Sequence, residues 1–137
     1  MNSFSDSSFP VGTLTIGKIF DFEAGHRLPS LPPKHKCSHQ HGHSYRVEVI
    51  LTAPALEAPG FVTDFGALVP FKRFLDTELD HQNLHEVLPF EPTSEHVAQF
   101  LAGWIIQNLE ADIPGRLVAV RVCETERSWA RFDVEQR

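Results

Sequence analysis

An alternation of apolar and polar side chains predicts a strand that begins near Gly42 and ends at Leu51. Successive side chains of a strand point to opposite faces, so this alternation indicates a strand with one buried face. An earlier apolar stretch, residues 13–26, predicts another strand that ends at His26, and the proline-containing residues 27–40 between them predict a surface loop. The positions on the predicted buried face are His43, Tyr45, Val47, Val49 and Leu51.

Apolar residues at helical spacing predict two helices in the middle of the chain. Asp64 is a candidate N-cap for the first helix, and Pro70, which lacks a backbone N–H, should either kink it or move its start towards residue 69. The second helix should open within residues 92–94 and end before residues 113–115. The apolar positions are Phe65, Leu68, Leu75 and Leu79 in the first helix, and Val97, Phe100, Leu101, Trp104, Ile105 and Leu109 in the second.

Two further strands, residues 116–125 and 128–135, predict a hairpin whose turn is Glu126 and Arg127. The order strand, strand, helix, helix, strand, strand is typical of an α+β domain. We therefore expect a four-stranded antiparallel sheet with two helices on one face.

The composition limits the size of the fold and the kinds of partner. At 137 residues, with 42% hydrophobic residues, the chain is long enough for one core and too short for two ordinary domains. We expect one domain over residues 13–137 and a disordered tail over residues 1–12. The net charge of −6 argues against non-specific binding to nucleic acid or to an acidic membrane.

Neither a membrane span nor a signal peptide is expected. No apolar run reaches the length of a membrane helix, and the first residues lack the basic and apolar regions of a signal peptide. The two cysteines, Cys37 and Cys123, are too few for a disulfide scaffold and suit a reducing compartment. These features predict a soluble cytoplasmic protein with two free thiols.

The stretch KCSHQHGHSY, residues 36–45, concentrates candidate metal ligands. His41 and His43 stand two residues apart, so on a strand their imidazoles share one face, about 7 Å apart. If the first two strands pair antiparallel, His26 at the end of one lies beside the start of the other. Three imidazoles with an open position are typical of a catalytic zinc site, although this ligand type also suits iron, nickel or copper.

Several alternatives stay open in this stretch. His35 and His39 are rival ligands, but they lie in the loop, where no register forces their side chains inward. A His-x-His sequence alone is also compatible with a hydrated strand start that binds no metal. Cys37 could supply a fourth ligand or stand off the metal as a base, and the flanking Lys34 and Lys36 favour its thiolate.

Two acidic residues are further candidates. Asp80 precedes His81 at the predicted end of the first helix, and a carboxylate that accepts a histidine N–H fixes the tautomer of the ring. Taken alone, the pair is more simply a polar helix end. Glu124 is directed towards the buried face of its strand, where a ligand with adjacent N–H donors would satisfy it, whereas Cys123 is expected to pack as a small apolar residue.

Several segments together resemble the 6-pyruvoyltetrahydropterin synthase superfamily. They are FEAGHRL, KCSHQHGHSY, GFVTDF, LDHQNL, PTSE and CET, and the likeness runs from about residue 18 to the last strand. The resemblance implies the tunnelling fold, in which the unit of four strands and two helices trimerises into a barrel. Two trimers then stack as a homohexamer, with active sites between subunits.

The resemblance also implies a metal site and a base. His26, His41 and His43 match the zinc ligands of the family, and Cys37 matches its catalytic base. The implied substrate is 7,8-dihydroneopterin triphosphate, whose side-chain hydroxyls zinc would bind and acidify.

Further residues match positions around the substrate. Asp80 and His81 match a pair that assists proton transfer, expected to come from a neighbouring subunit. Glu124 matches the carboxylate that anchors the pterin through its N–H edge. The triphosphate would be received by basic residues of the loop, although a solvated loop explains them equally well: Arg27, Lys34 and Lys36.

Two features favour the 6-carboxy branch of the superfamily: the short Cys-x-x-x-His-Gly-His spacing and Asp64, where the pyruvoyl branch usually has Asn. That branch forms 6-carboxy-5,6,7,8-tetrahydropterin and releases acetaldehyde and triphosphate, in bacterial 7-deazapurine (queuosine-type) synthesis. The rivals are a 6-pyruvoyl activity that stops after triphosphate elimination and a pterin-binding module without turnover.

His85 and His96 depart from the family, which usually has Asn at both positions, and affect the expected packing around the acid–base pair.

Overall fold

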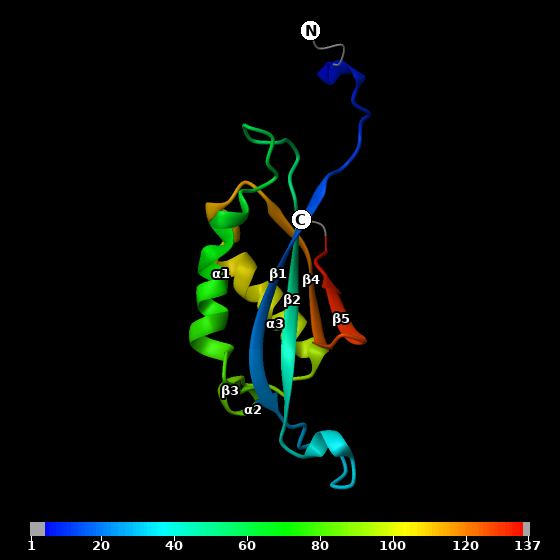
Figure 1. The fold of residues 1–137 in the computed structure, drawn as a ribbon, viewed down its shortest axis with the longest axis vertical. Helices are drawn as coiled ribbons and strands as arrows, with labels where there is room; N and C mark the ends of the chain where they lie inside the picture. The colour runs from blue at the N-terminus through cyan, green and yellow to red at the C-terminus, as the bar shows by residue number, and fades with distance from the viewer. Residues whose placement is uncertain (1–4, 136–137) are drawn as a thin grey trace.

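The computed structural model of the chain describes residues 5–135, and its centre is a mixed sheet of five strands (Figure 1). Four strands run antiparallel to their neighbours, and the short β3 (Gln82–Asn83) pairs parallel with β1. The order across the sheet is β3-β1-β2-β4-β5. The long strands are β1 (Thr15–His26), β2 (His41–Thr52), β4 (Arg116–Thr125) and β5 (Ser128–Asp133).

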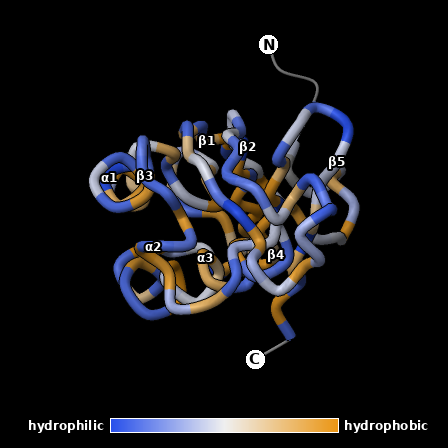
Figure 2. Tube along the Cα trace, turned by 90° about the horizontal axis from the view of Figure 1, so that it is seen from below, coloured by the Kyte–Doolittle hydropathy of each residue, from blue (hydrophilic) through white to orange (hydrophobic). Residues whose placement is uncertain are grey.

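The helices group on one side of this sheet, as the view along the strands in Figure 2 shows. The α-helices within residues 5–135 are α1 (Val69–Phe74), α2 (Leu84–Val87) and α3 (Ser94–Asn108), and α3 packs against β4 and β5. Shorter helical segments are the π-helical turn Leu75–Leu79 and the 3-10 turns Asp6–Ser8, Lys36–Ser38, Phe65–Leu68 and Glu110–Asp112.

The predicted α+β class is confirmed, but the predicted four-stranded antiparallel sheet with two helices is wrong. The additional strand β3 has two residues, too few to produce an alternating pattern, and it exists because Gln82 and Asn83 pair with Ala24 and Gly25. The additional helix α2 is a single turn, below the length at which apolar spacing is informative.

The first predicted helix is divided into three segments. Asp64 caps as expected, because its side chain accepts a hydrogen bond of 2.9 Å from the N–H of Gly66, but it begins a 3-10 turn instead of an α-helix. Helix α1 starts at Val69 with Pro70 in its first turn, where a missing N–H costs little, so the predicted shift of the start towards residue 69 is confirmed.

The core lies between the helices and the face of β2 that the alternation predicted. Tyr45, Val47, Val49 and Leu51 are at most 1% exposed. Phe22 of β1 stacks on Tyr45 with ring centroids 4.9 Å apart, and Phe20 meets Phe71 of α1 edge to face at 5.0 Å. The Phe20–Phe71 contact packs α1 against the first strand, and the Phe22–Tyr45 contact joins the first two strands.

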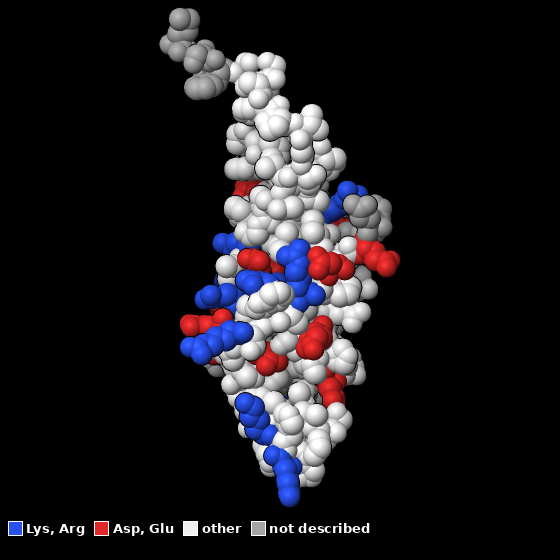
Figure 3. All heavy atoms as spheres, turned by 90° about the vertical axis from the view of Figure 1, so that its right-hand side faces the viewer, with Lys and Arg blue, Asp and Glu red and all other residues white. Residues whose placement is uncertain are grey.

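The opposite face of the sheet is polar. Arg46 pairs with Asp21 at 3.4 Å and Arg121 with Glu48 at 3.5 Å. On the side of the molecule that carries β5, acidic and basic side chains are interspersed (Figure 3). Within residues 5–135 we find no helix that combines the length and the apolar character needed to cross a bilayer.

The N-terminal residues that the structure describes contain the 3-10 turn Asp6–Ser8 and then irregular chain up to β1. Phe9 and Val11 are exposed, at 70% and 105%. Residues 1–4 of the predicted disordered tail lie outside the described residues.

The cap of α3 yields a stability prediction. Thr93 Oγ1 accepts a 3.1 Å hydrogen bond from the N–H of His96, so Thr93→Ala is expected to lower the free energy of unfolding by about 1 kcal/mol. Urea unfolding of this variant beside Thr93→Ser, which keeps the hydroxyl, measures the effect. Equal stabilities for the alanine variant and the wild type would contradict the assignment.

Candidate metal centre

The pairing of β1 with β2 brings three histidines together. His26, the last residue of β1, lies opposite His41, the first residue of β2, and Ala24 lies opposite His43. The Nε2 atom of His26 is 2.8 Å from Nε2 of His41 and 3.1 Å from Nε2 of His43. One nitrogen from each ring lies within 4.8 Å of the others, so the group could hold a metal ion.

Backbone carbonyls fix the orientation of two of these rings. The Nδ1 atom of His26 lies 2.8 Å from the carbonyl oxygen of Pro92, and Nδ1 of His41 lies 2.7 Å from that of His39. A carbonyl oxygen only accepts, so each Nδ1 carries the hydrogen and each Nε2 presents a lone pair. Two lone pairs 2.8 Å apart cannot hydrogen-bond to one another and are stabilised by a cation between them.

Burial favours the neutral form of His26 and His43. Loss of solvation lowers the pKa of His26, which is 1% exposed, and that of His43, while the carboxylate of Glu124 opposes both shifts. Glu124 Oε2 is 3.6 Å from Nε2 of His43, and burial also raises the pKa of the neighbouring Tyr45. Neutral imidazole is the form that binds metals, so the site is prepared for binding at neutral pH.

Cys37 occupies the 3-10 turn of the loop, outside the three-histidine group. Its N–H donates to Nδ1 of His35 at 3.0 Å, its carbonyl accepts from Leu28 at 2.8 Å, and its side chain is half-buried. The rival ligands also point elsewhere, since the ring of His35 bonds to the Cys37 backbone and Nε2 of His39 donates to the carbonyl of Pro33. Among residues 5–135, the metal-binding group therefore contains neither rival nor the thiol.

Asp80 and His81 are held by the backbone of Glu23. Asp80 Oδ1 accepts the Glu23 N–H at 2.8 Å, and Asp80 Oδ2 lies 2.9 Å from Nδ1 of the His81 ring. The backbone N–H of His81 donates to the Glu23 carbonyl at 2.5 Å. The Glu23 N–H, and then the His81 ring, lower the pKa of Asp80. His81 has a φ of 61°, a conformation that costs a non-glycine residue roughly 1–2 kcal/mol.

Glu23 was missed by the sequence reasoning. Its contribution comes from contacts with residues more than fifty positions away, for which the local pattern carries no signal. Its own carboxylate accepts a 2.7 Å hydrogen bond from Ser44 Oγ on the next strand.

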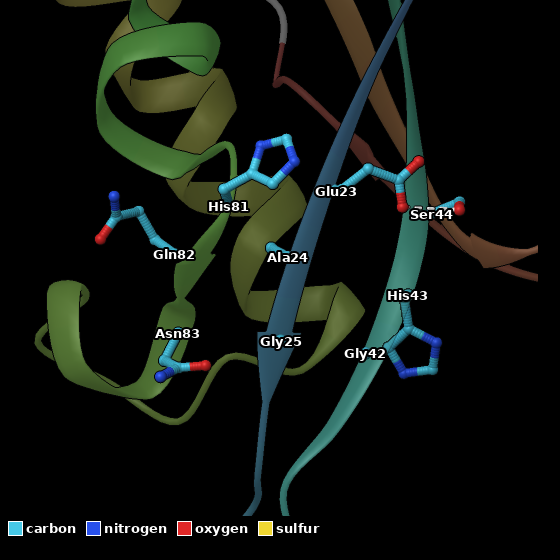
Figure 4. Close-up of a pocket in the computed structure, with 9 residues that line it drawn as sticks. All are labelled: Glu23, Ala24, Gly25, Gly42, His43, Ser44, His81, Gln82 and Asn83. Atoms are coloured by element: carbon cyan, nitrogen blue, oxygen red, sulfur yellow. Dashed lines mark hydrogen bonds between the residues drawn. The ribbon is translucent and has the colours of Figure 1, made fainter.

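A hollow of about 380 Å³ is lined by residues of β1, β2 and the segment 81–83 (Figure 4). Gly25 and Gly42 face each other across β1 and β2, so no side chains fill the sheet at this point. A Cβ on Gly25 would meet the side-chain amides of Gln40 and Asn83, so both amides would have to shift if another residue stood there. His43 and His81 are both lining residues of the hollow, whereas His26, His41 and Asp80 are not.

Other predicted residues lie around this centre. Glu124 lines a second hollow of about 520 Å³, together with Ser94, Glu95 and Trp129. The basic residues suggested for the triphosphate are exposed on the loop and line neither hollow: Arg27, Lys34 and Lys36.

Comparisons with known proteins agree over most of the chain. The family model for 6-pyruvoyl tetrahydropterin synthase matches residues 15–135. A Synechocystis sp. protein named 6-carboxy-5,6,7,8-tetrahydropterin synthase is 41% identical over 127 residues, covering 85% of this chain and 91% of that protein.

Two solved structures have the same fold. The 6-pyruvoyl tetrahydropterin synthase of Caenorhabditis elegans superposes with a TM-score of 0.78 at 25% identity, covering 93% of this chain and 99% of that one. An uncharacterized protein of Wolinella succinogenes gives a TM-score of 0.80 at 27% identity, covering 91% and 100%.

The three-histidine group yields a metal-binding prediction. The protein is expected to bind about one divalent transition-metal ion per chain, and chelation should lower its thermal midpoint, because a ligand that binds the folded state stabilises it. His43→Ala should abolish both effects. Elemental analysis and thermal unfolding with and without chelator provide the measurement. An equal loss in His39→Ala, whose ring lies outside the group, would contradict the assignment.

The Asp80 contacts yield a pH prediction. Because its pKa is lowered on folding, Asp80 contributes stability above its unfolded pKa, near pH 4, and this contribution is lost as the pH falls through the lower folded value. Asp80→Asn should therefore be less stable than the wild type at neutral pH, with the difference shrinking in acid. Thermal unfolding of both proteins across this range tests it, and a difference that grows in acid would refute the explanation.

Proposed function

The chain belongs to the 6-pyruvoyl tetrahydropterin synthase family, and on this premise we propose that it is a zinc-dependent lyase acting on 7,8-dihydroneopterin triphosphate. The proposed products are 6-carboxy-5,6,7,8-tetrahydropterin, acetaldehyde and triphosphate. The observation that carries the proposal is the convergence of the Nε2 atoms of three histidines, one of which, His43, lines the same hollow as His81.

The donor set fits zinc. His26, His41 and His43 offer three neutral nitrogens, and the carbonyls behind His26 and His41 supply the outer hydrogen bonds that orient metal-binding imidazoles. When bound, zinc supplies a Lewis acid that acidifies the hydroxyls of the substrate side chain.

Side chains around the metal centre would transfer protons and bind the pterin. We assign Cys37 as the base that removes a proton from the side chain, and the Asp80–His81 pair as its partner in proton transfer. The lowered pKa of Asp80 keeps its carboxylate ionised, which suits a group that accepts the His81 N–H. Glu124, close to His43 and open to the second hollow, would accept the adjacent N–H groups of the pterin.

The triphosphate would be received by the loop that carries the thiol. Both Arg27 and Lys36 are exposed there, and Lys36 is the first residue of the turn that holds Cys37. Their charge offsets an anionic substrate in a protein that is negative overall.

The choice of the 6-carboxy reaction rests on two kinds of support. The Cys37 to His41 spacing and Asp64 favour that branch in the sequence, and the Synechocystis relative carries that name. The pathway proposed is cytoplasmic 7-deazapurine synthesis. The second candidate is the 6-pyruvoyl reaction, which the name of the C. elegans structure favours.

A homohexamer of two stacked trimers is part of the proposal. In the part of the chain that the structure describes, β5 pairs with β4 alone, so one of its edges is unpaired. Trp129 on this strand is 57% exposed. An open strand edge is a template for pairing with another subunit.

The decisive experiment is product analysis of the zinc-loaded protein with dihydroneopterin triphosphate. Mass spectrometry should find the 6-carboxy pterin together with an equal amount of trapped acetaldehyde. A pyruvoyl product without acetaldehyde would establish the second candidate. Retained pterin binding without turnover would indicate a binding module.

The thiol is tested by Cys37→Ala. This variant should lose turnover by a factor of about 10²–10⁴, the range expected for a missing base, while its affinity for the pterin changes little. Cys123→Ala is the matched control, because it removes the other free thiol, which lies on β4. Unchanged turnover in Cys37→Ala would exclude the assigned base.

A further inference from the structure

Glu91, between α2 and α3, makes a paired contact with the loop that carries Cys37. Its Oε1 accepts the N–H of Ser30 at 2.8 Å, and its Oε2 accepts the Ser30 hydroxyl at 2.6 Å. Within residues 5–135, two residues of the loop 27–40 hydrogen-bond to a distant part of the chain: Ser30, through this carboxylate, and Gln40, whose Nε2 donates to Asn83 Oδ1 at 3.0 Å. We call the contact between Glu91 and Ser30 the tether. Hydrogen bonds to an ionised acceptor are stronger than neutral ones, so the tether is strong for a surface contact.

The tether reaches the thiol through bonds inside the loop. The N–H of Leu28 donates to the carbonyl of Cys37 at 2.8 Å, and the N–H of Leu31 donates to the carbonyl of Leu28 at 3.2 Å. Ser30 stands between these two residues. A displacement of Ser30 would therefore move the turn that holds Cys37.

The other end of the tether is anchored at the metal centre. Pro92, the residue after Glu91, is buried and accepts the Nδ1–H of His26. The carbonyl of Glu91 accepts from the backbone N–H of Thr93 at 2.9 Å and from the Nδ1–H of His96 at 2.7 Å. His96, a departure from the family, thus helps to hold the same segment, and its ring packs edge to face on Phe90.

We propose that Glu91 is a positioning residue: it ties the Cys37 loop to the segment that orients His26, and so fixes the thiol relative to the metal. The inference rests on the proposed function, since that function assigns Cys37 as the base that acts beside the metal. The metal group keeps its own supports, the β1–β2 register and the Pro92 carbonyl. Loss of the Glu91 carboxylate should therefore move the thiol and leave metal binding almost intact.

The first test is the alkylation rate of Cys37 in the zinc-loaded protein, followed by peptide mapping so that Cys123 serves as an internal reference. Glu91→Ala should raise the rate at Cys37 roughly tenfold, the scale of a lost hydrogen bond to a charged group, with Cys123 unchanged. Ser30→Ala, which removes the hydroxyl bond alone, should give a smaller rise. The double variant should add little to Glu91→Ala, because the two residues form one contact.

The second test separates positioning from general damage. Glu91→Ala should lower kcat roughly tenfold with little change in KM, and its zinc dissociation constant should stay within about threefold of the wild type. Glu78→Gln, which neutralises an exposed carboxylate on the turn after α1, is the matched control and should change none of these values.

The outcomes are distinct. Unchanged alkylation of Cys37, loss of zinc, or a faster alkylation without any fall in kcat would each overturn the assignment of Glu91. Full turnover in Cys37→Ala would instead overturn the role proposed for the thiol, whatever the alkylation rates. The two proposals can therefore fail separately.

Discussion

The antiparallel register of β1 with β2 is the constraint on which the site depends. It places His26 opposite His41, with His43 on the same face, and it sets Gly25 opposite Gly42 to leave the hollow beside them. A slip of one residue would turn these side chains to the other face of the sheet. Phe22 and Tyr45 form the next cross-strand pair on the core face, and their stacked rings stabilise this register by burying aromatic area.

The sequence predicted those features that arise from local periodicity. The long strands and α3 have enough residues to show their period, and the N-cap of α3 and the start of α1 follow from Thr93 and Pro70. The convergence of three histidines could also be predicted, because it needs only one pairing of adjacent strands. The strand β3 and helix α2 could not, since they are too short for any period and exist through contacts with distant residues.

The supporting residues of the site were invisible for a related reason. Glu23 and Glu91 act on residues 57 and 61 positions away, and neither stands in a pattern that distinguishes it from an ordinary surface carboxylate. Glu23 acts through its backbone, which holds Asp80 and His81, whereas Glu91 contacts Ser30 through its carboxylate. Such contacts depend on where the chain runs, which side-chain identity alone does not reveal.

The left-handed backbone at His81 has a consequence for related chains. Glycine or asparagine would adopt this φ at a smaller backbone cost. Substitutions to residues that lack the imidazole would therefore relieve backbone strain at this position. In a lineage released from selection for the proton transfer that we propose for it, this histidine should be among the first residues to be replaced. Its presence in a newly sequenced relative is therefore a more telling sign of retained chemistry than the buried histidine His26, whose loss would also disturb packing.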